Sequence, residues 1–138
     1  MRTNLTFAGI FVLFVALGNP ISAHHSFTAE FDSAKPVSLK GTVTRVDWRN
    51  PHIWVYFDAQ EADGKTTPWK CEGASPNDLT RQGWSPKTLK IADPISIEGF
   101  RSKDGLNICS ARKWTLPDGK AVFGGSVDYS DPAARGRQ

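Results

Sequence analysis

The sequence predicts a small, mainly β domain. Short segments in which apolar and polar residues alternate recur through the chain after residue 36, as the two faces of half-buried strands require. Turn signals containing Gly, Pro, Asn or Asp separate these segments, and one intervening segment carries the start signals of a helix. Residues 37–124 are therefore expected to form the domain, followed by a loose tail over 125–138 that has little to bury.

The first expected strand is long and bent. Apolar and polar residues alternate over 37–43, and the apolar set then continues one residue late at Val46 and Trp48. Such a slip indicates a β-bulge, and Gly41 nearby permits sharp bending. A long, bent first strand is what a small closed barrel needs.

The remaining strands follow from the same alternation and from the turns between them. Asn50-Pro51 and Asp63-Gly64 bring the chain round into the second and third strands. The expected strands after the first cover residues 52–59, 66–72, 95–99 and 106–115, with a short edge strand over 121–123.

A short helix is expected between the third and fourth strands. Ser75 fits the N-cap, Pro76 fits the first helical position and Gly83 suits the C-terminal cap. Three strands, a short helix and two more strands is the order of the OB-fold, a five-stranded Greek-key barrel. The sequence therefore predicts an OB-fold-like small barrel of five or six strands, with a small β-sandwich as the alternative.

Residues 1–23 predict a secretory signal peptide. Arg2 gives a positive start, residues 7–17 are almost all apolar, and Ala23 offers a small residue at the cleavage site. The apolar run is too short to span a bilayer, which takes about 20 residues. We therefore expect a periplasmic or secreted mature protein that begins at His24 with an arm over 24–36 and has no membrane span.

Charge composition and the absence of common catalytic motifs argue against nucleic-acid binding and against enzymatic activity. The chain has 17 Lys and Arg against 14 Asp and Glu without a run of like charge, so it lacks the clustered basic face that nucleic-acid binding needs. Gly-x-Ser-x-Gly, His-Glu-x-x-His and Gly-rich phosphate-loop motifs are absent from the sequence. We expect a monomeric, non-enzymatic binding protein with no nucleic-acid partner.

The chain has two cysteines, Cys71 and Cys109. An even number in an exported protein favours a disulfide, and neither cysteine has the CxxC spacing or the nearby histidine of a metal site. In an OB barrel the third and fifth strands are neighbours, and both cysteines fall on the expected inward face. The alternative is two buried free thiols that pack as small apolar residues.

Short motifs fall in a fixed order along nearly the whole expected mature chain. They are Ala23-His24-His25-Ser26-Phe27, Lys35-Pro36-Val37, Gly41-Thr42-Val43, Asn50-Pro51-His52, Ala74-Ser75-Pro76-Asn77, Gly83-Trp84 and Thr115-Leu116-Pro117-Asp118-Gly119. Together they resemble a family of small exported bacterial proteins of unknown function whose mature chains begin HHSF. The resemblance implies export and a small β domain without an established activity. The two cysteines depart from the family pattern, so a disulfide would be a local feature.

The three histidines suggest a metal site. His24 and His25 would open the mature protein, and His52 lies at the turn into the second strand. The α-amine and the ring Nδ1 of His24 can chelate one ion, and a further imidazole completes a nitrogen set that suits Cu(II), or Zn²⁺ with a water. The alternative is that the first two are solvated and that His52 bonds a backbone carbonyl. The Irving–Williams order favours copper over zinc at such a site where copper is available.

Aromatic residues suggest a ligand-binding face. Trp54 and Tyr56 project from the second strand opposite its apolar face, and Trp48 precedes that strand. OB barrels bind sugars and oligonucleotides on the face of strands two and three, so these residues are expected to bind a small molecule, a glycan or a periplasmic protein. The alternative is that Phe27 and Phe31 of the arm cover this face.

Overall fold

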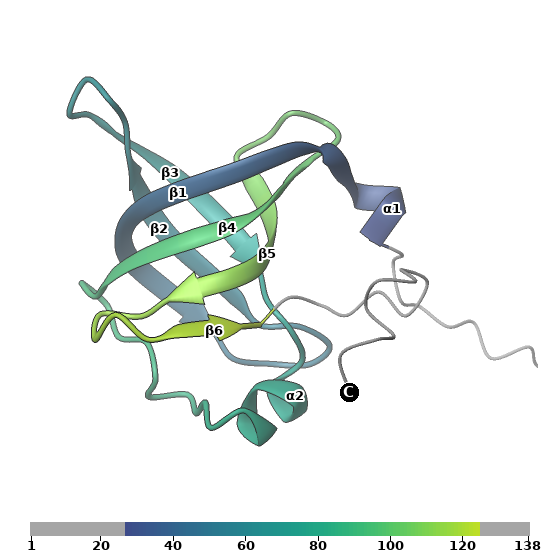
Figure 1. The fold of residues 1–138 in the computed structure, drawn as a ribbon, viewed down its shortest axis with the longest axis vertical. Helices are drawn as coiled ribbons and strands as arrows, with labels where there is room; N and C mark the ends of the chain where they lie inside the picture. Colours follow the sequence, from purple (N-terminus) through teal and green to yellow (C-terminus); the bar gives the residue numbers. More distant parts are fainter. Residues whose placement is uncertain (1–26, 125–138) are drawn as a thin grey trace, which may run out of the picture.

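The computed structural model describes residues 27–124, in which one sheet curls into a barrel (Figure 1). The expected signal peptide, His24, His25 and the expected tail over 125–138 lie outside the described residues. The elements are α1 (Phe27–Glu30), β1 (Phe31–Asp47), β2 (Trp54–Gln60), β3 (Thr66–Glu72), α2 (Pro76–Arg81), β4 (Pro94–Ser102), β5 (Ile108–Thr115) and β6 (Ala121–Phe123).

The strand pairings form a closed ring. Hydrogen-bonded neighbours follow the order β3-β2-β1-β4-β5-β6, and β3 also pairs with β5. The β3–β5 pairing is parallel, whereas the others are antiparallel. The ring therefore runs β1-β2-β3-β5-β4 and returns to β1, with β6 added to β5. This arrangement confirms the OB-fold-like barrel, with α2 as the short helix between β3 and β4.

Strand β1 bends at the predicted place. Val43 pairs with Phe57 of β2, and Arg45 pairs with the preceding Tyr56, so the register shifts by one residue at Thr44. At Gly41 a Cβ atom would lie 2.3 Å from the carbonyl oxygen of residue 58, so only glycine fits this close approach. The predicted bulge and its glycine are both present.

The start of β1 differs from the expectation. The strand begins at Phe31 and not near residue 37, and α1 precedes it. Phe31 is buried and pairs with Ser102 of β4, whereas residues 33–36 are exposed. Because residues 33–36 are all exposed, buried and exposed positions do not alternate there, and the sequence lacks the apolar–polar alternation that predicts a strand. Much of the expected arm therefore belongs to the sheet.

The other elements differ from the expectation only at their ends. β3 and β6 have the expected bounds, β2 and β5 each begin two residues later, and β4 is longer at both ends. α2 begins as predicted, because the Ser75 side chain accepts a hydrogen bond of 3.2 Å from the Asp78 amide. Gly83 follows the helix with a φ of +85°, which favours glycine.

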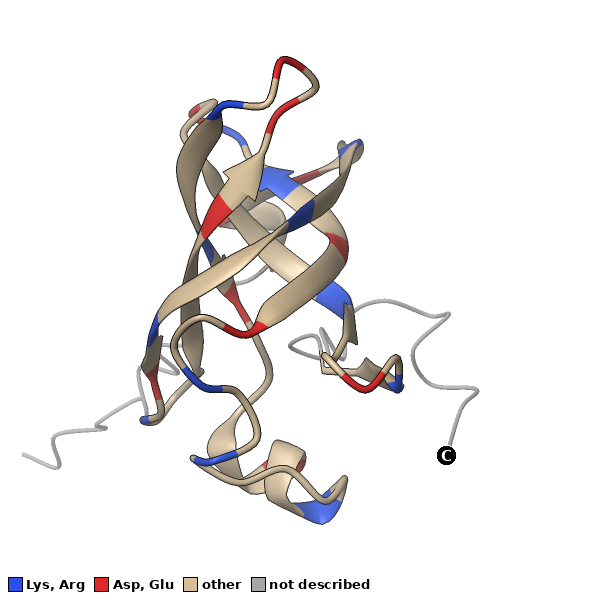
Figure 2. Cartoon of the chain, turned by 90° about the vertical axis from the view of Figure 1, so that its left-hand side faces the viewer, with Lys and Arg blue, Asp and Glu red and all other residues tan. Residues whose placement is uncertain are grey.

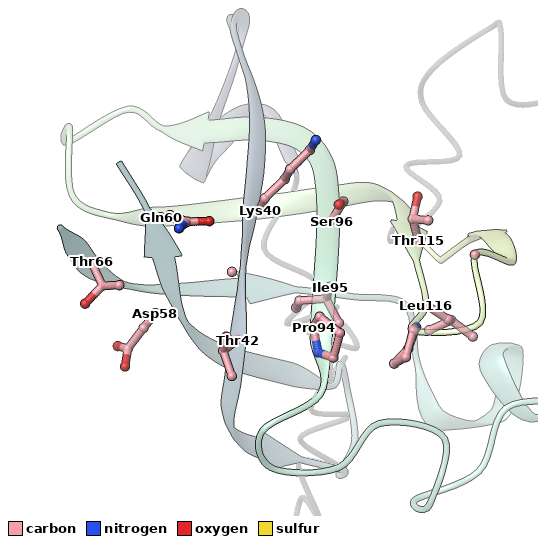
Figure 3. Close-up of a pocket in the computed structure, with 13 residues that line it drawn as sticks. Lys40, Thr42, Asp58, Gln60, Thr66, Pro94, Ile95, Ser96, Thr115 and Leu116 are labelled. Atoms are coloured by element: carbon pink, nitrogen blue, oxygen red, sulfur yellow. The ribbon is translucent and has the colours of Figure 1, made fainter. Parts of the chain in front are cut away.

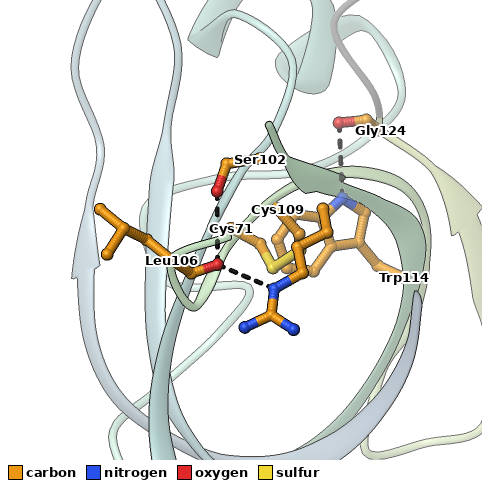
Figure 4. The surroundings of a disulfide bond; sticks show 7 residues. Cys71, Ser102, Leu106, Cys109, Trp114 and Gly124 are labelled. Carbon is orange, nitrogen blue, oxygen red and sulfur yellow. Dashed lines mark hydrogen bonds between the residues drawn. A yellow bond between two sulfur atoms is a disulfide. The ribbon is translucent and has the colours of Figure 1, made fainter. Parts of the chain in front are cut away.

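The core of the barrel centres on Trp114 and a disulfide (Figure 4). Trp114 is fully buried and donates a hydrogen bond from Nε1 to the Gly124 carbonyl at 3.4 Å, while Trp84 packs edge-on against it. The structure joins Cys71 and Cys109 in a disulfide across the β3–β5 pairing. Side chains from all six strands and from α2 contribute to the core, including Val43, Val55, Phe57, Trp69, Leu79, Ile97 and Val122.

Candidate functional site

The aromatic side chains of β2 lie on the outer face of the barrel. Trp54 and Tyr56 are half-buried, while the residues that alternate with them point into the core. A cation covers each ring: the Lys70 ammonium lies 4.9 Å from the centre of the Trp54 ring, and the Arg45 guanidinium lies 4.7 Å from that of Tyr56. The face is therefore aromatic and cationic together.

Trp54 opens onto a cavity of about 440 Å³ at one edge of this face. Its walls come from α1 and the start of β1, from β3, and from the turn between β4 and β5. We call it the Trp54 groove. The residues that line it are Ala29, Glu30, Phe31, Trp54, Lys70, Ser102, Lys103, Asp104 and Ile108.

Hydrogen bonds hold the walls of the Trp54 groove in place. The backbone amide of Lys103 donates to the Glu30 carbonyl at 2.9 Å, and its ammonium donates to the Thr28 carbonyl at 2.5 Å. These two bonds attach α1 to the β4–β5 turn. Within the turn, Asp104 accepts a hydrogen bond of 2.6 Å from the Ser102 hydroxyl, which lowers the pKa of the carboxyl group. The groove is therefore largely preformed.

Arg101 also stabilises the β4–β5 turn through hydrogen bonds. Its guanidinium donates to the Leu106 carbonyl at 3.0 Å and to the Gly105 carbonyl at 2.7 Å. It also lies 5.1 Å from the centre of the Trp69 ring. These bonds use the backbone carbonyls of residues 105 and 106, which explains why β5 begins only at Ile108.

A histidine–carboxylate pair lies beside the groove. His52 Nδ1 and Glu72 Oε1 share a hydrogen bond, and their side chains are 20% and 12% exposed. Glu72 is also the ladder partner of Trp54. The hydrogen bond with Glu72 raises the pKa of His52 against the effect of burial, and the charges of Glu72, Glu30 and Asp78 raise it further. The imidazole is therefore oriented by a carboxylate and not by a backbone carbonyl.

The structure separates some of the predicted site residues. Trp48 is half-buried and packs against the core, whereas Trp54 lines the groove. Phe27 stacks on Phe31 and meets Phe100 edge-on, with ring centres 5.7 Å apart in both pairs. The phenylalanines of the arm therefore pack on one another and on β4, and Phe31 forms a wall of the groove.

Sequence reasoning missed the charged residues of the site. Lys70 and Glu72 occupy the outward positions of β3, where charged residues are ordinary, so neither stands out as a binding residue. Among residues 27–124, no three His, Cys, Asp or Glu side chains gather as a metal site would require. His52 is the one predicted metal ligand that the structure describes.

A second cavity, of about 460 Å³, opens at the other end of the barrel (Figure 3). Its polar side chains come from different strands and point in different directions, with Lys40 from β1 and Asp58 and Gln60 from β2. These three side chains are half-buried or exposed. We regard this cavity as a solvated mouth of the barrel.

Charges of both signs are interspersed over the described residues (Figure 2). Basic and acidic positions alternate along the strands and turns, without a face of one sign in this view. Neither helix within residues 27–124 is long and apolar enough to cross a membrane.

The His52–Glu72 pair predicts a pH-dependent contribution to stability. Because folding raises the pKa of His52, the pair stabilises the fold fully below the unfolded-state pKa of about 6.5 and loses this contribution as the pH rises through the folded-state pKa. Glu72→Gln should therefore lower the free energy of unfolding by about 1–2 kcal/mol more near pH 6 than near pH 9, measured by urea denaturation.

Asp63→Asn provides a control for this experiment. It removes an exposed carboxylate that pairs with Lys65 in the β2–β3 turn, at the opposite end of β2 from His52, and should cost the same at both pH values. An equal loss for Glu72→Gln at the two pH values would show that His52 carries no stabilising charge.

Comparison with known proteins gives a family but no function. No curated protein and no solved structure matches the chain. Residues 12–110, well over half of the chain, match a family described only as one of unknown function, DUF6152. This match agrees with the expected family of unknown function, and it covers the Trp54 side of the barrel through the first residues of β5. The chain belongs to the DUF6152 family.

Proposed function

We propose that this protein is a non-enzymatic binding protein, exported through its N-terminal signal peptide to the periplasm or medium, whose ligand occupies the Trp54 groove. The observation that carries the proposal is the position of Trp54, on the β2–β3 face and open to a cavity of about 440 Å³. Small-molecule sites are commonly clefts of about 300–1,000 Å³. OB barrels bind their ligands on this face and on the loop between the fourth and fifth strands.

The chemistry of the groove favours a ligand with a flat or sugar ring. The face of an indole stacks well on such a ring, and Ile108 supplies further apolar surface. Lys70, Lys103 and Asp104 place donors and acceptors around the same cavity. Because hydrogen bonds already hold α1 and the β4–β5 turn, the ligand has little ordering to impose on the protein.

Trp54→Ala should remove ligand binding and leave the fold intact. N-acetylglucosamine oligomers and indole serve as ring-bearing probes, and binding is followed by NMR shifts of the tryptophan side-chain N–H signals. Tyr56→Ala is the matched control, because Tyr56 lies on the same face but does not line the groove. We expect the probes to shift the Trp54 signal and Tyr56→Ala to retain binding.

Stability separates this proposal from a packing role. A Trp→Ala change in a core costs about 3–5 kcal/mol, whereas a half-exposed ligand-binding Trp should cost far less. A large drop in the melting midpoint of Trp54→Ala would mean that Trp54 is a structural residue. Failure of both probes to shift its signal would also contradict the proposal.

A copper site is the second candidate, and the His52–Glu72 pair favours it. Histidines that bind metals commonly donate their other ring N–H to a carboxylate, which orients the ring. With Nδ1 bonded to Glu72, Nε2 is the ring nitrogen that remains to coordinate an ion. Glu30 at the end of α1 and Trp54 line the same groove, and Trp54 is the ladder partner of Glu72, so α1 lies on the side of the barrel that holds the pair. His24 precedes α1 by three residues, a reach of about 10 Å when extended.

The proposed copper site needs the free amine of His24. Calorimetric titration of Cu(II) should therefore show far weaker binding to a form with an extra N-terminal Met than to the processed form. His52→Ala should also weaken binding, and binding should fall on acidification because the ligand nitrogens take up protons. Equal affinity of the processed and Met-extended forms would exclude the amine chelate and leave the proposal of the Trp54 groove unaffected.

A further inference from the structure

Strand β5 contains a bulge at Arg112. Glu98 of β4 pairs with Lys113 and the next residue, Gly99, pairs with Ala111, so Arg112 is left without a partner in this ladder. Ala111 and Trp114 on either side are fully buried, whereas Arg112 and Lys113 are half-buried. The extra residue therefore brings two consecutive basic side chains to the outer face. Bulges commonly redirect side chains in this way beside binding sites.

The two basic residues differ in their partners. Lys113 forms an ion pair of 2.7 Å with Glu98. The guanidinium of Arg112 lies 4.8 Å from the centre of the Phe27 ring and 5.6 Å from that of Phe100. Its Nε is buried without a hydrogen-bond partner, and no ion pair to Arg112 occurs among residues 27–124. Arg112 is thus a cation beside aromatic rings, without a carboxylate partner among the described residues.

The terminal amino groups of the Arg112 guanidinium are the donors that a ligand can reach, since its Nε has no exposed surface. A carboxylate matches the planar guanidinium with two parallel hydrogen bonds, and aromatic neighbours that exclude water strengthen such a pair. An anion is therefore the ligand group that this guanidinium fits best.

Arg112 lines an apolar cavity of about 620 Å³, the largest of the three described here. Val37, Phe100 and Phe123 supply its hydrocarbon surface from β1, β4 and β6. Phe123 is 66% exposed, so its ring presents apolar surface to a ligand in the cavity. Gly99 permits the close approach of β4 and β5 at the bulge, where a Cβ atom would lie 2.1 Å from the Ser110 carbonyl oxygen. The other charged residues that line the cavity, Glu98 and Lys113, pair with each other, so Arg112 is the lining cation that remains for an anionic group.

We propose that this cavity, the Arg112 groove, binds a small amphipathic monocarboxylate. Its carboxylate accepts hydrogen bonds from the Arg112 guanidinium, and its hydrocarbon chain lies along Phe100 and Phe123. The site is separate from the Trp54 groove, since the two cavities share no lining residue. The Arg112 proposal therefore does not depend on the Trp54 proposal or on the copper proposal.

Decanoate is the probe, titrated calorimetrically into the processed protein. We expect saturable binding of decanoate and at least tenfold weaker binding of the neutral analogue decanamide. Arg112→Gln should lose at least tenfold in affinity, and Arg112→Lys should lose less, because it keeps the charge but not the paired donors. Arg49→Gln is the matched control: it removes an exposed arginine that pairs with Asp47, and it should bind decanoate as the unmodified protein does.

Two further variants keep the test decisive. Phe123→Ser changes an exposed side chain, so it should fold normally and still weaken decanoate binding, even if Arg112→Gln fails to fold. Trp54→Ala should bind decanoate unchanged. The proposal is overturned if decanoate does not bind, if decanamide binds equally well, or if Trp54→Ala and not Phe123→Ser removes binding.

Discussion

The short parallel pairing between β3 and β5 is the constraint on which the rest of the structure depends. It joins Lys70, Cys71 and Glu72 to Ile108, Cys109 and Ser110, with the disulfide at the central pair. Without it, β3 and the first residues of β5 would present open edges, which sheets must cover or pair. With it, the sheet becomes a ring in which β1 to β4 each have two neighbours and β5 has three. Closure therefore fixes the curvature of the barrel and its filled core.

The same pairing assembles the outer site. Because side chains alternate along a strand, the inward Cys71 is flanked by the outward Lys70 and Glu72. Lys70 then lies over Trp54 and beside Ile108, where both line the groove, while Glu72 bonds His52 from the β1–β2 turn. Three consecutive residues of β3 thus contribute to both features: Cys71 to the closed core, and Lys70 and Glu72 to the polar outer site. The Arg112 bulge lies on the same strand, β5, just beyond this pairing.

Local patterns could be predicted from the sequence, whereas contacts between distant segments could not. The phase slip before Val46, the Ser75 cap and the two inward cysteines each depend on a few neighbouring residues, and the structure has all three. The His52–Glu72 bond joins residues 20 apart in sequence, so no local period reveals it. The bulge at Arg112 did leave a signal, because the buried Ala111 and Trp114 are three residues apart where alternation requires two or four.

Hydrogen exchange of the oxidised and reduced protein tests most directly whether the β3–β5 closure holds the barrel. In the oxidised protein, amides of this pairing, including that of Lys70 bonded to the Asn107 carbonyl at 3.1 Å, should exchange as slowly as those of the β1–β4 core. Reduction opens a loop that spans 38 residues and should lower the free energy of unfolding by about 4 kcal/mol. The β3–β5 amides should then exchange ahead of the β1–β4 amides. Unchanged exchange and stability after reduction would contradict the account.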